Sequence, residues 1–535
     1  MMKKTIKKLL AALLAVAMVC AMAIPAFAYD TEEDLGKNHC YDAFQIFKGD
    51  VSDDNTKISH VEWGKNIPHP EDFLEKLTEV PTIGGEFETN FTAQEAAAVI
   101  SKWHDSDNNS IAFARFVCNY IYTDSNADSV PVLQGGHTNG FKLEEAGYYL
   151  IVDTSSFSSS ADGDSYHAYN SFLLKVNKDH YHVQITPKVV KPTVEKEVYD
   201  NNDIGSTGGW GSSADHAINE EFQFRLIAKL PASEKGRAYD YYDKYSVIFH
   251  DTLSDGITYD RPDSVVIKSN GKTYVIPNDS SKYTIGLESQ NYLVVKIPDV
   301  KACAKDAGFD LNDGATITVT YTAHLNENAA VNGSAENKNS VRLQYSNNPR
   351  PDGEYWGYTP NYTPESEVYV YTYQLNNTKY HDEVNENNKL EGAGFRLYSD
   401  EACNNEIKLK KNNDGTYSRD FSTGASGVEM ISDNKGQFNV KGLDAGTYYL
   451  KETTPPAGYS ACKVIPVTIK ADHSRNDQVN LEGSNLTNDI VNIKAGGITL
   501  PSTGGIGTTI FYVVGGGLMV AAIVLLVTKK RMENK

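Results

Sequence analysis

Short runs of alternating apolar and polar residues, separated by Gly, Asn and Asp turns, fill the chain between its two ends. Clear examples are residues 222–227, 316–321 and 448–452. Because successive side chains of a strand point to opposite faces of a sheet, this pattern predicts half-buried strands and an all-β fold of tandem sandwich domains. The 535 residues are enough for three or four domains of about 150 residues each.

Changes in pattern divide the chain into three folded units and two terminal segments. The first unit is the most mixed, because residues 92–121 have a helix-like pattern. A proline-containing stretch at 349–364 separates the second unit from the third. We therefore predict a leader at 1–28, units at 29–187, 188–363 and 364–497, and a C-terminal segment at 498–535.

The N-terminus has the form of a secretory signal. Four lysines in the first eight residues precede an apolar run at 9–24, and Ala26-Phe27-Ala28 supplies small residues where a signal peptidase cuts. We expect cleavage after Ala28. The alternative is a retained membrane helix, for which the apolar run is short.

The C-terminus combines three features in a fixed order. The pentapeptide Leu500, Pro501, Ser502, Thr503, Gly504 comes first, an apolar stretch at 506–527 follows, and a basic tail beginning at Lys529 ends the chain. At about 1.5 Å per residue, that stretch is long enough to cross a bilayer as a helix. The basic tail then stays on the inner side.

This arrangement resembles the LPxTG sorting signal of Gram-positive surface proteins. The resemblance implies that a sortase cleaves between Thr503 and Gly504 and transfers the Thr503 acyl group to an amine. The apolar helix would then hold the chain in the membrane only for a time, and the product would be anchored in the cell wall through peptidoglycan.

Charge and motifs exclude several classes of function. The net charge of −20 rules out binding of nucleic acid through bulk electrostatics. The chain has no HExxH zinc motif, GxSxG nucleophile elbow or phosphate loop, so we expect no conventional enzyme and no cofactor. Residues 105–109 resemble the start of a calcium loop, but Ser110 and Phe116 replace its glycine and glutamate. We therefore expect a helix cap or turn there, and no metal.

The cysteines do not form an obvious disulfide framework. Cys20 lies in the leader, and the five that remain are an odd number at long spacing. Pairing of Cys403 with Cys462, or of Cys40 with Cys118, stays open. The five are Cys40, Cys118, Cys303, Cys403 and Cys462, and we expect most of them to be buried thiols.

Three polar residues of the second unit lie on strand faces that should be buried. Lys196 shares the parity of Val194 and Val198, and Asp251 and Asn339 share that of their apolar neighbours. Buried polar groups are costly unless they meet one another. The simpler interpretation is that the three are unrelated residues at strand ends, and Asn337, with the same parity as Asn339, is the alternative amide.

A buried Lys, Asp and Asn can form a bond among themselves. Desolvation lowers the pKa of a lysine, which frees the amine as a nucleophile, and raises that of a carboxyl, which makes it a proton donor. Lys196 could attack the Asn339 carboxamide while the Asp251 acid polarises its carbonyl. Ammonia would leave and a Lys–Asn isopeptide bond would remain.

At this point the chain resembles the sortase-assembled pilins of Gram-positive bacteria, whose immunoglobulin-like domains crosslink themselves in this way. In the third unit, residues 390–398 (LEGAGFRLY) resemble a strand of Cna-B-type domains. Residues 446–459 (GTYYLKETTPPAGY) resemble the family's E-box, with proline at 455 where alanine is usual. By this resemblance Lys379 is the nucleophile, Asn492 its amide partner and Glu452 the acid. The first unit matches through residues 41–49, 62–64 and 147–153, without a convincing third triad.

The family also implies an assembly lysine between the first two units. Pilins often carry Tyr-Pro-Lys there, whose lysine attacks the sortase-bound threonine of the next subunit, and this chain has Thr-Pro-Lys ending at Lys188. An acceptor for another subunit must be exposed, which favours Lys188, with Lys191 as the alternative. The predicted function is therefore a backbone pilin polymerised from Thr503 to Lys188. The alternative is a wall-anchored adhesin or accessory pilin that binds a host ligand.

Overall fold

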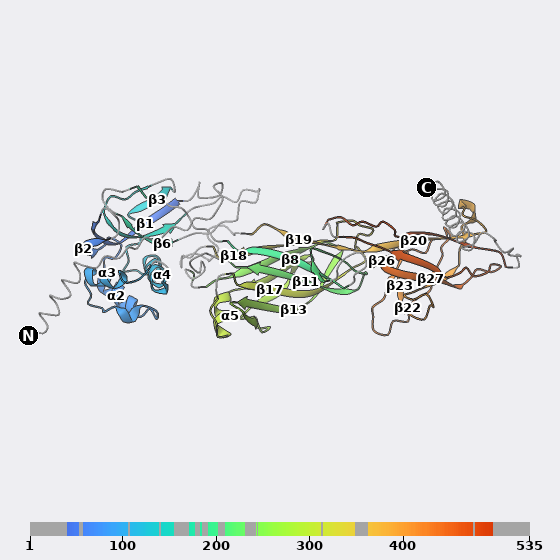
Figure 1. Cartoon of the computed structure of the whole chain (residues 1–535), viewed down its shortest axis with the longest axis horizontal. Coiled ribbons are helices and arrows are strands. Elements are labelled where there is room, and N and C mark those ends of the chain that lie inside the picture. The colour runs from blue at the N-terminus through green and yellow to red at the C-terminus, as the bar shows by residue number, and fades with distance from the viewer. Residues whose placement is uncertain are drawn as a thin grey trace, which may run out of the picture.

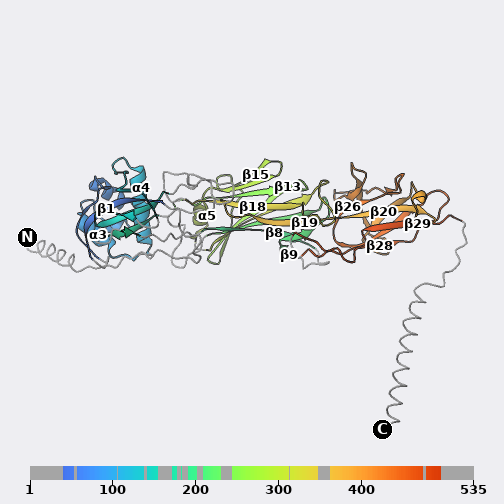
Figure 2. The same cartoon turned by 90° about the horizontal axis from the view of Figure 1, so that it is seen from above.

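The computed structural model describes residues 40–52, 57–104, 107–137, 141–154, 171–176, 182–183, 191–201, 209–230, 242, 244–311, 314–347, 362–473 and 477–495. These residues form three units that follow one another along a single long axis (Figures 1 and 2). Strands dominate, and most helix lies in the first unit, as the sequence predicted. The leader, Lys188 and the whole sorting segment from 498 onward fall outside the described residues.

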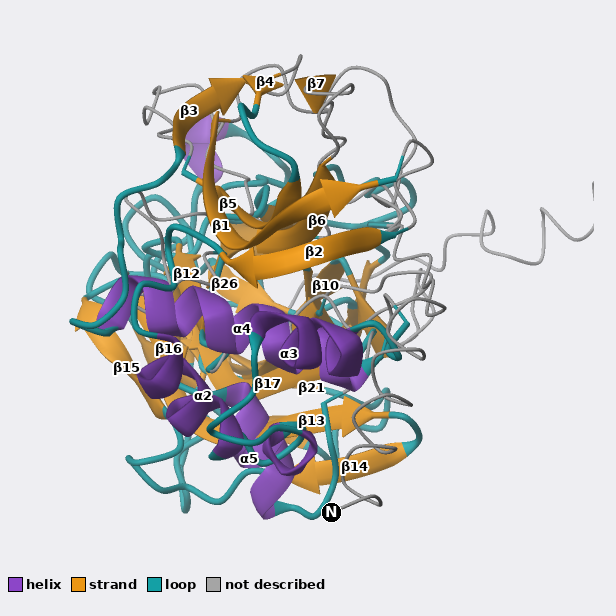
Figure 3. Cartoon of the chain, turned by 90° about the vertical axis from the view of Figure 1, so that its left-hand side faces the viewer, coloured by secondary structure: helices purple, strands orange, loops and turns teal. Residues whose placement is uncertain are grey.

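The first unit is a sheet covered by helices on one side (Figure 3). Its strand order is β2-β1-β5-β6, with β3 beside β1, and a small pair β4–β7 lies apart. Thr92 and Glu95 form a capping box that starts α3, where their side chains satisfy the first free amides of the helix. The bounds are β1 (Cys40–Val51), β2 (Ile58–Trp63), α2 (Pro70–Thr78), a 3₁₀ turn η1 (Gly84–Glu86), α3 (Ala93–Ile100), α4 (Asn108–Thr123), β3 (Leu133–His137), β4 (Phe141–Lys142), β5 (Gly147–Asp153), β6 (Ser171–Val176) and β7 (His182–Val183).

The helix-like pattern at 92–121 corresponds to α3 and α4, whose apolar faces pack on the sheet. Asp107 occupies the N-cap position of α4, so this part of the calcium-like stretch is the start of a helix. Asp105 itself lies outside the described residues.

The middle unit is a sandwich of two six-stranded sheets. One has the order β10-β19-β18-β12-β16-β15, and the other β14-β13-β17-β11-β8-β9. Strict alternation along β11 places every second side chain in the core between the sheets. The bounds are β8 (Thr193–Asp200), β9 (Gly209–Gly211), β10 (Ser213–Asp215), β11 (Glu221–Lys229), β12 (Val247–Leu253), β13 (Ile257–Ser269), β14 (Lys272–Val275), β15 (Thr284–Ser289), β16 (Tyr292–Ile297), α5 (Val300–Asp306), β17 (Thr316–Leu325), β18 (Lys338–Tyr345) and β19 (Ser366–Tyr371).

Strand β19 links the middle unit to the next one. It pairs antiparallel with β18 and parallel with β10, so the middle sandwich continues to Tyr371. The sequence boundary between 363 and 364 therefore falls just before a strand of this sandwich. Only Thr372 separates β19 from β20 of the third unit.

The third unit is a smaller sandwich of two five-stranded sheets. Their orders are β23-β24-β26-β20-β29 and β22-β21-β27-β28, with β25 beside β21. Apolar residues from both sheets form one core. The bounds are β20 (Tyr373–His381), η3 (Glu386–Asn388), β21 (Gly394–Tyr398), β22 (Glu406–Ile407), β23 (Leu409–Lys411), β24 (Tyr417–Arg419), β25 (Met430–Ile431), β26 (Val440–Leu443), β27 (Gly446–Thr454), β28 (Ile465–Ile469) and β29 (Thr487–Asn492).

The middle and third units are in direct contact. The Ile218 amide donates to the Gly442 carbonyl at 2.9 Å, and the Asn219 side chain donates to the Arg419 carbonyl at 3.1 Å. Gly442 has φ +75°, and a Cβ there would meet Ile218 at 2.3 Å. A side chain at 442 would thus be strained and would push the two units apart.

The cysteines and the helices of the described residues bear on two further expectations. Of the five cysteines there, Cys118 and Cys303 are buried, whereas Cys40, Cys403 and Cys462 keep partial exposure. The expectation that most of the five are buried is therefore wrong. No helix within the described ranges is long and apolar enough to cross a membrane. The span predicted at 506–527 lies outside them.

Candidate crosslinking sites

The three polar residues predicted in the middle unit meet between its two sheets. Asp251 on β12 and Asn339 on β18 are diagonal neighbours, because Asp251 pairs with Val341 and Leu253 pairs with Asn339. Lys196 reaches them from β8 in the opposite sheet. All three are at most 2% exposed, so strand parity correctly placed each of them in the core.

A tyrosine that sequence reasoning missed completes this cluster. The Lys196 Nζ lies 2.5 Å from Asp251 Oδ1 and 3.2 Å from the Tyr321 hydroxyl. That hydroxyl donates to Asp251 Oδ2 at 2.6 Å and accepts from the Asn339 amide at 2.7 Å. Tyr321 therefore connects the acid to the amide. It shares the parity of Ile317 and Val319 on β17, a signal that could have found it.

Burial drives both ionisable groups of the pair toward their neutral forms. It lowers the pKa of Lys196 to about 8 and raises that of Asp251, in each case against the attraction between the two. The aromatic rings of Phe224 and Tyr321 lie 5.1 and 5.4 Å from the Lys196 Nζ and help to exclude water. A proton passing from ammonium to carboxylate would leave a free amine beside a carboxylic acid.

The alternative amide, Asn337, is occupied elsewhere. Its carboxamide accepts from the Ala330 amide at 2.8 Å and donates to the carbonyls of Ala330 and Val370. It therefore holds the loop before β18 in place. Among the described contacts, Asn339 and not Asn337 belongs to the lysine cluster.

The third unit brings together the residues that the E-box resemblance implied. Lys379 on β20 and Asn492 on β29 are diagonal neighbours in adjacent parallel strands, since Lys379 pairs with Ile490. Glu452 comes from β27 in the opposite sheet. Lys379 and Asn492 are at most 1% exposed and Glu452 is 6% exposed.

Here the nucleophile touches its partner directly. The Lys379 Nζ lies 2.6 Å from Asn492 Oδ1, and the Asn492 amide nitrogen donates to Glu452 Oε1 at 2.7 Å. The Cys462 amide donates to the second Glu452 oxygen at 2.7 Å and fixes the carboxyl. Burial lowers the pKa of Lys379, although the charge of Glu452 acts in the opposite direction.

The two sites use the sandwich in opposite ways. In the middle unit the acid and the amide share one sheet and the lysine crosses from the other. In the third unit the lysine and the amide share a sheet and the acid crosses. In both, the lysine and the asparagine lie in a desolvated core. The amide nitrogen meets the Glu452 carboxyl directly in the third unit, and it is linked to Asp251 through the Tyr321 hydroxyl in the middle unit.

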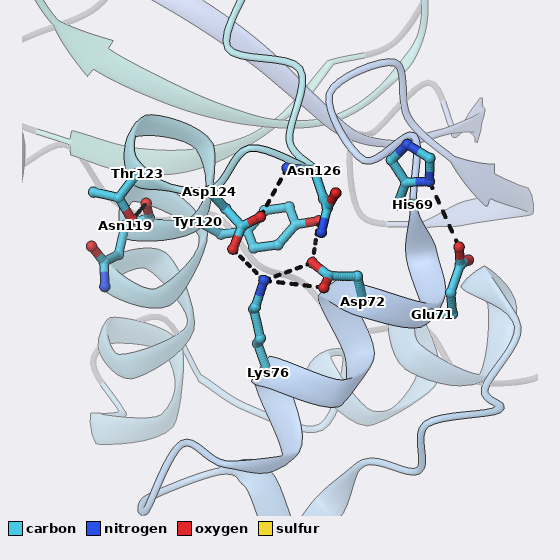
Figure 4. Close-up of polar contacts among 9 residues, drawn as sticks. All are labelled: His69, Glu71, Asp72, Lys76, Asn119, Tyr120, Thr123, Asp124 and Asn126. Carbon is cyan, nitrogen blue, oxygen red and sulfur yellow. Dashed lines mark hydrogen bonds and ion pairs between the residues drawn. The ribbon is translucent and has the colours of Figure 1, made fainter.

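The first unit holds a cluster of similar composition but opposite electrostatics (Figure 4). Lys76 forms ion pairs with Asp72, at 2.9 Å, and with Asp124, and Tyr120 donates to Asp72. The Lys76 side chain is 39% exposed. Its contact with Asp124 raises the pKa of Lys76, and Lys76 in turn lowers that of Asp72. Both shifts favour the charged forms of Lys76 and Asp72, so the cluster is an ion-pair network that joins α2 to the end of α4.

Three family models match the chain. Residues 219–349 match the Cna-B-like domain of Gram-positive pilin backbone subunit 2, residues 374–484 a prealbumin-like fold domain, and residues 492–534 the LPXTG cell wall anchor motif. The Cna-B-like description thus falls on the middle unit rather than on the third. A comparison with curated protein sequences gave no match.

Several solved pilins are similar to the chain. The T6 backbone pilin of Streptococcus pyogenes is 16% identical, with 88% of this chain and 100% of that one covered and a TM-score of 0.48. The major pilin SpaD of Corynebacterium diphtheriae is 20% identical, with 70% of this chain and 86% of that one covered and a TM-score of 0.42. A C-terminal fragment of the major pilin GBS80 of Streptococcus agalactiae is 22% identical, with 56% of this chain and 99% of that one covered and a TM-score of 0.40.

Proposed function

The chain is a backbone pilin of a Gram-positive, cell-wall-anchored pilus, and from this premise we propose that Lys196–Asn339 and Lys379–Asn492 isopeptide bonds close its second and third units. The observation that supports this most directly is the Lys379 Nζ, 2.6 Å from the Asn492 carboxamide in a buried site that contains Glu452. The residue set in the middle unit gives independent support.

The chemistry balances within each site. The neutral lysine amine attacks the carboxamide carbon, a C–N bond forms, and the original C–N bond of the asparagine breaks to release ammonia. As the new bond forms, the lysine nitrogen gives up one proton to the carboxyl. Glu452 accepts a hydrogen bond from the nitrogen that leaves, and so can pass a proton on to the departing ammonia. In the middle unit that proton passes from Asp251 through the Tyr321 hydroxyl. We expected the acid to polarise the carbonyl, but its position favours assistance to the leaving group.

The finer steps of assembly are also part of the proposal. A sortase would cleave after Thr503 and join its carbonyl to the Lys188 amine of the next subunit, and the terminal subunit would be joined to peptidoglycan. Tension would then enter near Lys188, just before β8, and leave after β29. It would pass through both isopeptide bonds, so the sandwiches would not carry it through hydrogen bonds alone.

Intact mass spectrometry tests the crosslinks. The chain from residue 29 to 503 should weigh about 34 Da less than its sequence mass, since each bond expels one ammonia of about 17 Da. Asp251→Asn and Glu452→Gln should each retain one loss of about 17 Da, and the double variant none. Asp72→Asn, from the partly exposed ion-pair network of the first unit, is the matched control and should keep both losses. Folded wild-type protein at its full sequence mass would refute the proposal.

Wall extracts from cells that carry the cognate sortase test the polymer linkage. Wild-type chain should give a ladder of very large species, and Lys188→Ala should reduce it to a single wall-linked band. Lys191→Ala is the control and should leave the ladder intact. A ladder that persists in Lys188→Ala and is lost in Lys191→Ala would move the acceptor to Lys191.

A further inference from the structure

Three ionisable side chains from two units converge at the junction between the middle and third units. Asp200 ends β8, Asp215 lies on β10, and His473 follows β28 of the third unit. All three are at most 3% exposed, and one ligand atom from each lies within 4.8 Å of the others. None of them takes part in the crosslinking sites.

The hydrogen bonds of Ser213 settle which nitrogen of His473 carries a proton. The Ser213 hydroxyl lies 2.7 Å from the His473 carbonyl, to which it must donate its single hydrogen. The same oxygen lies 2.9 Å from His473 Nδ1 and therefore accepts a hydrogen bond from that nitrogen. Nδ1 is thus protonated, and a neutral ring would present a lone pair on Nε2.

That Nε2 faces the two carboxylates. It lies 3.2 Å from Asp200 Oδ2 and 4.0 Å from Asp215 Oδ1, and among the described residues it has no hydrogen-bond partner of good geometry. With a neutral ring, the Nε2 lone pair and the two carboxylate oxygens repel one another, and a cation bound between them would remove that repulsion.

The surroundings have the form of an outer shell around a ligand set. Ser213 orients the imidazole through Nδ1, and the Tyr373 hydroxyl donates to the second oxygen of Asp215 at 2.9 Å. Metal-binding histidines commonly donate their other ring nitrogen in this manner, and metal-binding carboxylates are themselves hydrogen-bonded.

We propose that Asp200, Asp215 and His473 bind a divalent transition-metal ion of the zinc type that joins the middle unit to the third. One imidazole nitrogen and two carboxylate oxygens suit Zn²⁺, whereas Ca²⁺ and Mg²⁺ prefer sites built from oxygen alone. With bonds of about 2.0–2.2 Å, tetrahedral zinc ligands lie roughly 3.3–3.5 Å apart. The His473–Asp200 distance of 3.2 Å already matches this, whereas Asp215, 4.0 Å from the His473 nitrogen, needs to move inward. Water would complete the coordination.

Such an ion would tie β8 directly to the third unit. β8 also carries Lys196, so the metal would connect a crosslinked strand to the next sandwich without passing through β18 and β19.

Calorimetric titration of the chain from residue 29 to 503, stripped with a chelator, tests the site. Zn²⁺ should bind with one equivalent that Ca²⁺ and Mg²⁺ do not displace, and it should raise the unfolding temperature. His473→Gln should weaken this binding at least tenfold. The control is His324→Gln, because His324 pairs with a single partly exposed carboxylate of Asp260 and its loss should leave the titration unchanged.

The opposite results are equally clear. If a proton fills the gap as an imidazolium, zinc will not bind stoichiometrically and neither zinc nor chelator will shift the unfolding temperature, which overturns the proposal. Should His473→Gln fail to fold, X-ray absorption of the zinc-loaded wild type decides. Nitrogen and oxygen neighbours at about 2.0–2.2 Å support the site, and a sulfur shell at about 2.3 Å, from cysteine, refutes it.

Discussion

Replacing Glu452 by glutamine should remove the crosslink of the third unit with little change in shape. Glutamine keeps a carbonyl oxygen for the Cys462 amide but cannot carry a proton from Lys379 to the nitrogen that leaves Asn492. Lys379 and Asn492 would remain in contact without forming a bond. The third unit would then unfold as an open chain instead of a closed loop.

The size of the effect follows from the length of that loop. Lys379 and Asn492 are 113 residues apart. Closing a loop of that length removes unfolded-chain entropy worth about 4.8 kcal/mol at 25 °C in the chain-entropy treatment. For a unit of this size, 1 kcal/mol shifts the midpoint by roughly 3–4 °C, so Glu452→Gln should lower the unfolding temperature of the third unit by roughly 15–20 °C.

Differential scanning calorimetry, paired with intact mass on the same sample, measures this. Glu401→Gln, an exposed glutamate of the same unit, is the control and should change neither quantity. If Glu452→Gln shows only one mass loss of about 17 Da and still melts within 5 °C of wild type, the isopeptide bond does not stabilise the fold. A sample with unchanged ammonia loss would show that Glu452 is not the acid.

Three further outcomes are expected. Tyr321→Phe should slow bond formation in the middle unit by about 10- to 100-fold, because it breaks the path from Asp251 to Asn339, and intact mass during cell-free synthesis measures this. The same assay should show that the rate of bond formation in the middle unit falls as the pH rises past about 8, the pKa to which burial lowers Lys196. Above that pH the Lys196–Asp251 pair loses the proton that the leaving ammonia needs. A rate that climbs steadily to pH 10 would contradict this mechanism. Lys76→Met should leave the mass deficit at about 34 Da, as in wild type. A deficit about 17 Da smaller than that of wild type would reveal a crosslink in the first unit.

Strand parity was sufficient to place Lys196, Asp251 and Asn339 in a core, because each lies within a long regular strand. It was not sufficient to choose between Asn337 and Asn339, which have the same parity. That choice depends on whether the backbone of a nearby loop takes up the amide, and Ala330 and Val370 do so for Asn337. Only the folded loop shows this.

Contacts between units were beyond the reach of local pattern. Asp200 and His473 belong to different sandwiches and come together only through the docking of one unit on the other. The predicted boundary after residue 363 likewise separates β19 from β18 and β10, with which it pairs, since an apolar strand does not itself indicate which of two neighbouring sheets it joins. The C-terminal sorting motif could be predicted without a folded structure, because it is a short local pattern, and the family model for the LPXTG anchor matches residues 492–534.

The position of β19 has a consequence for how a fibre of these subunits would stretch. With both proposed bonds in place, the backbone from Asn339 to Lys379 is still enclosed by neither, and β19 lies in the middle of it, held between β10 and β18. A strong enough pull would draw β19 lengthwise out of its sheet and release up to 40 residues (379 − 339), or at most roughly 140 Å of slack per subunit. The filament would lengthen in discrete steps under a sudden load and shorten again when β19 re-pairs with its neighbours.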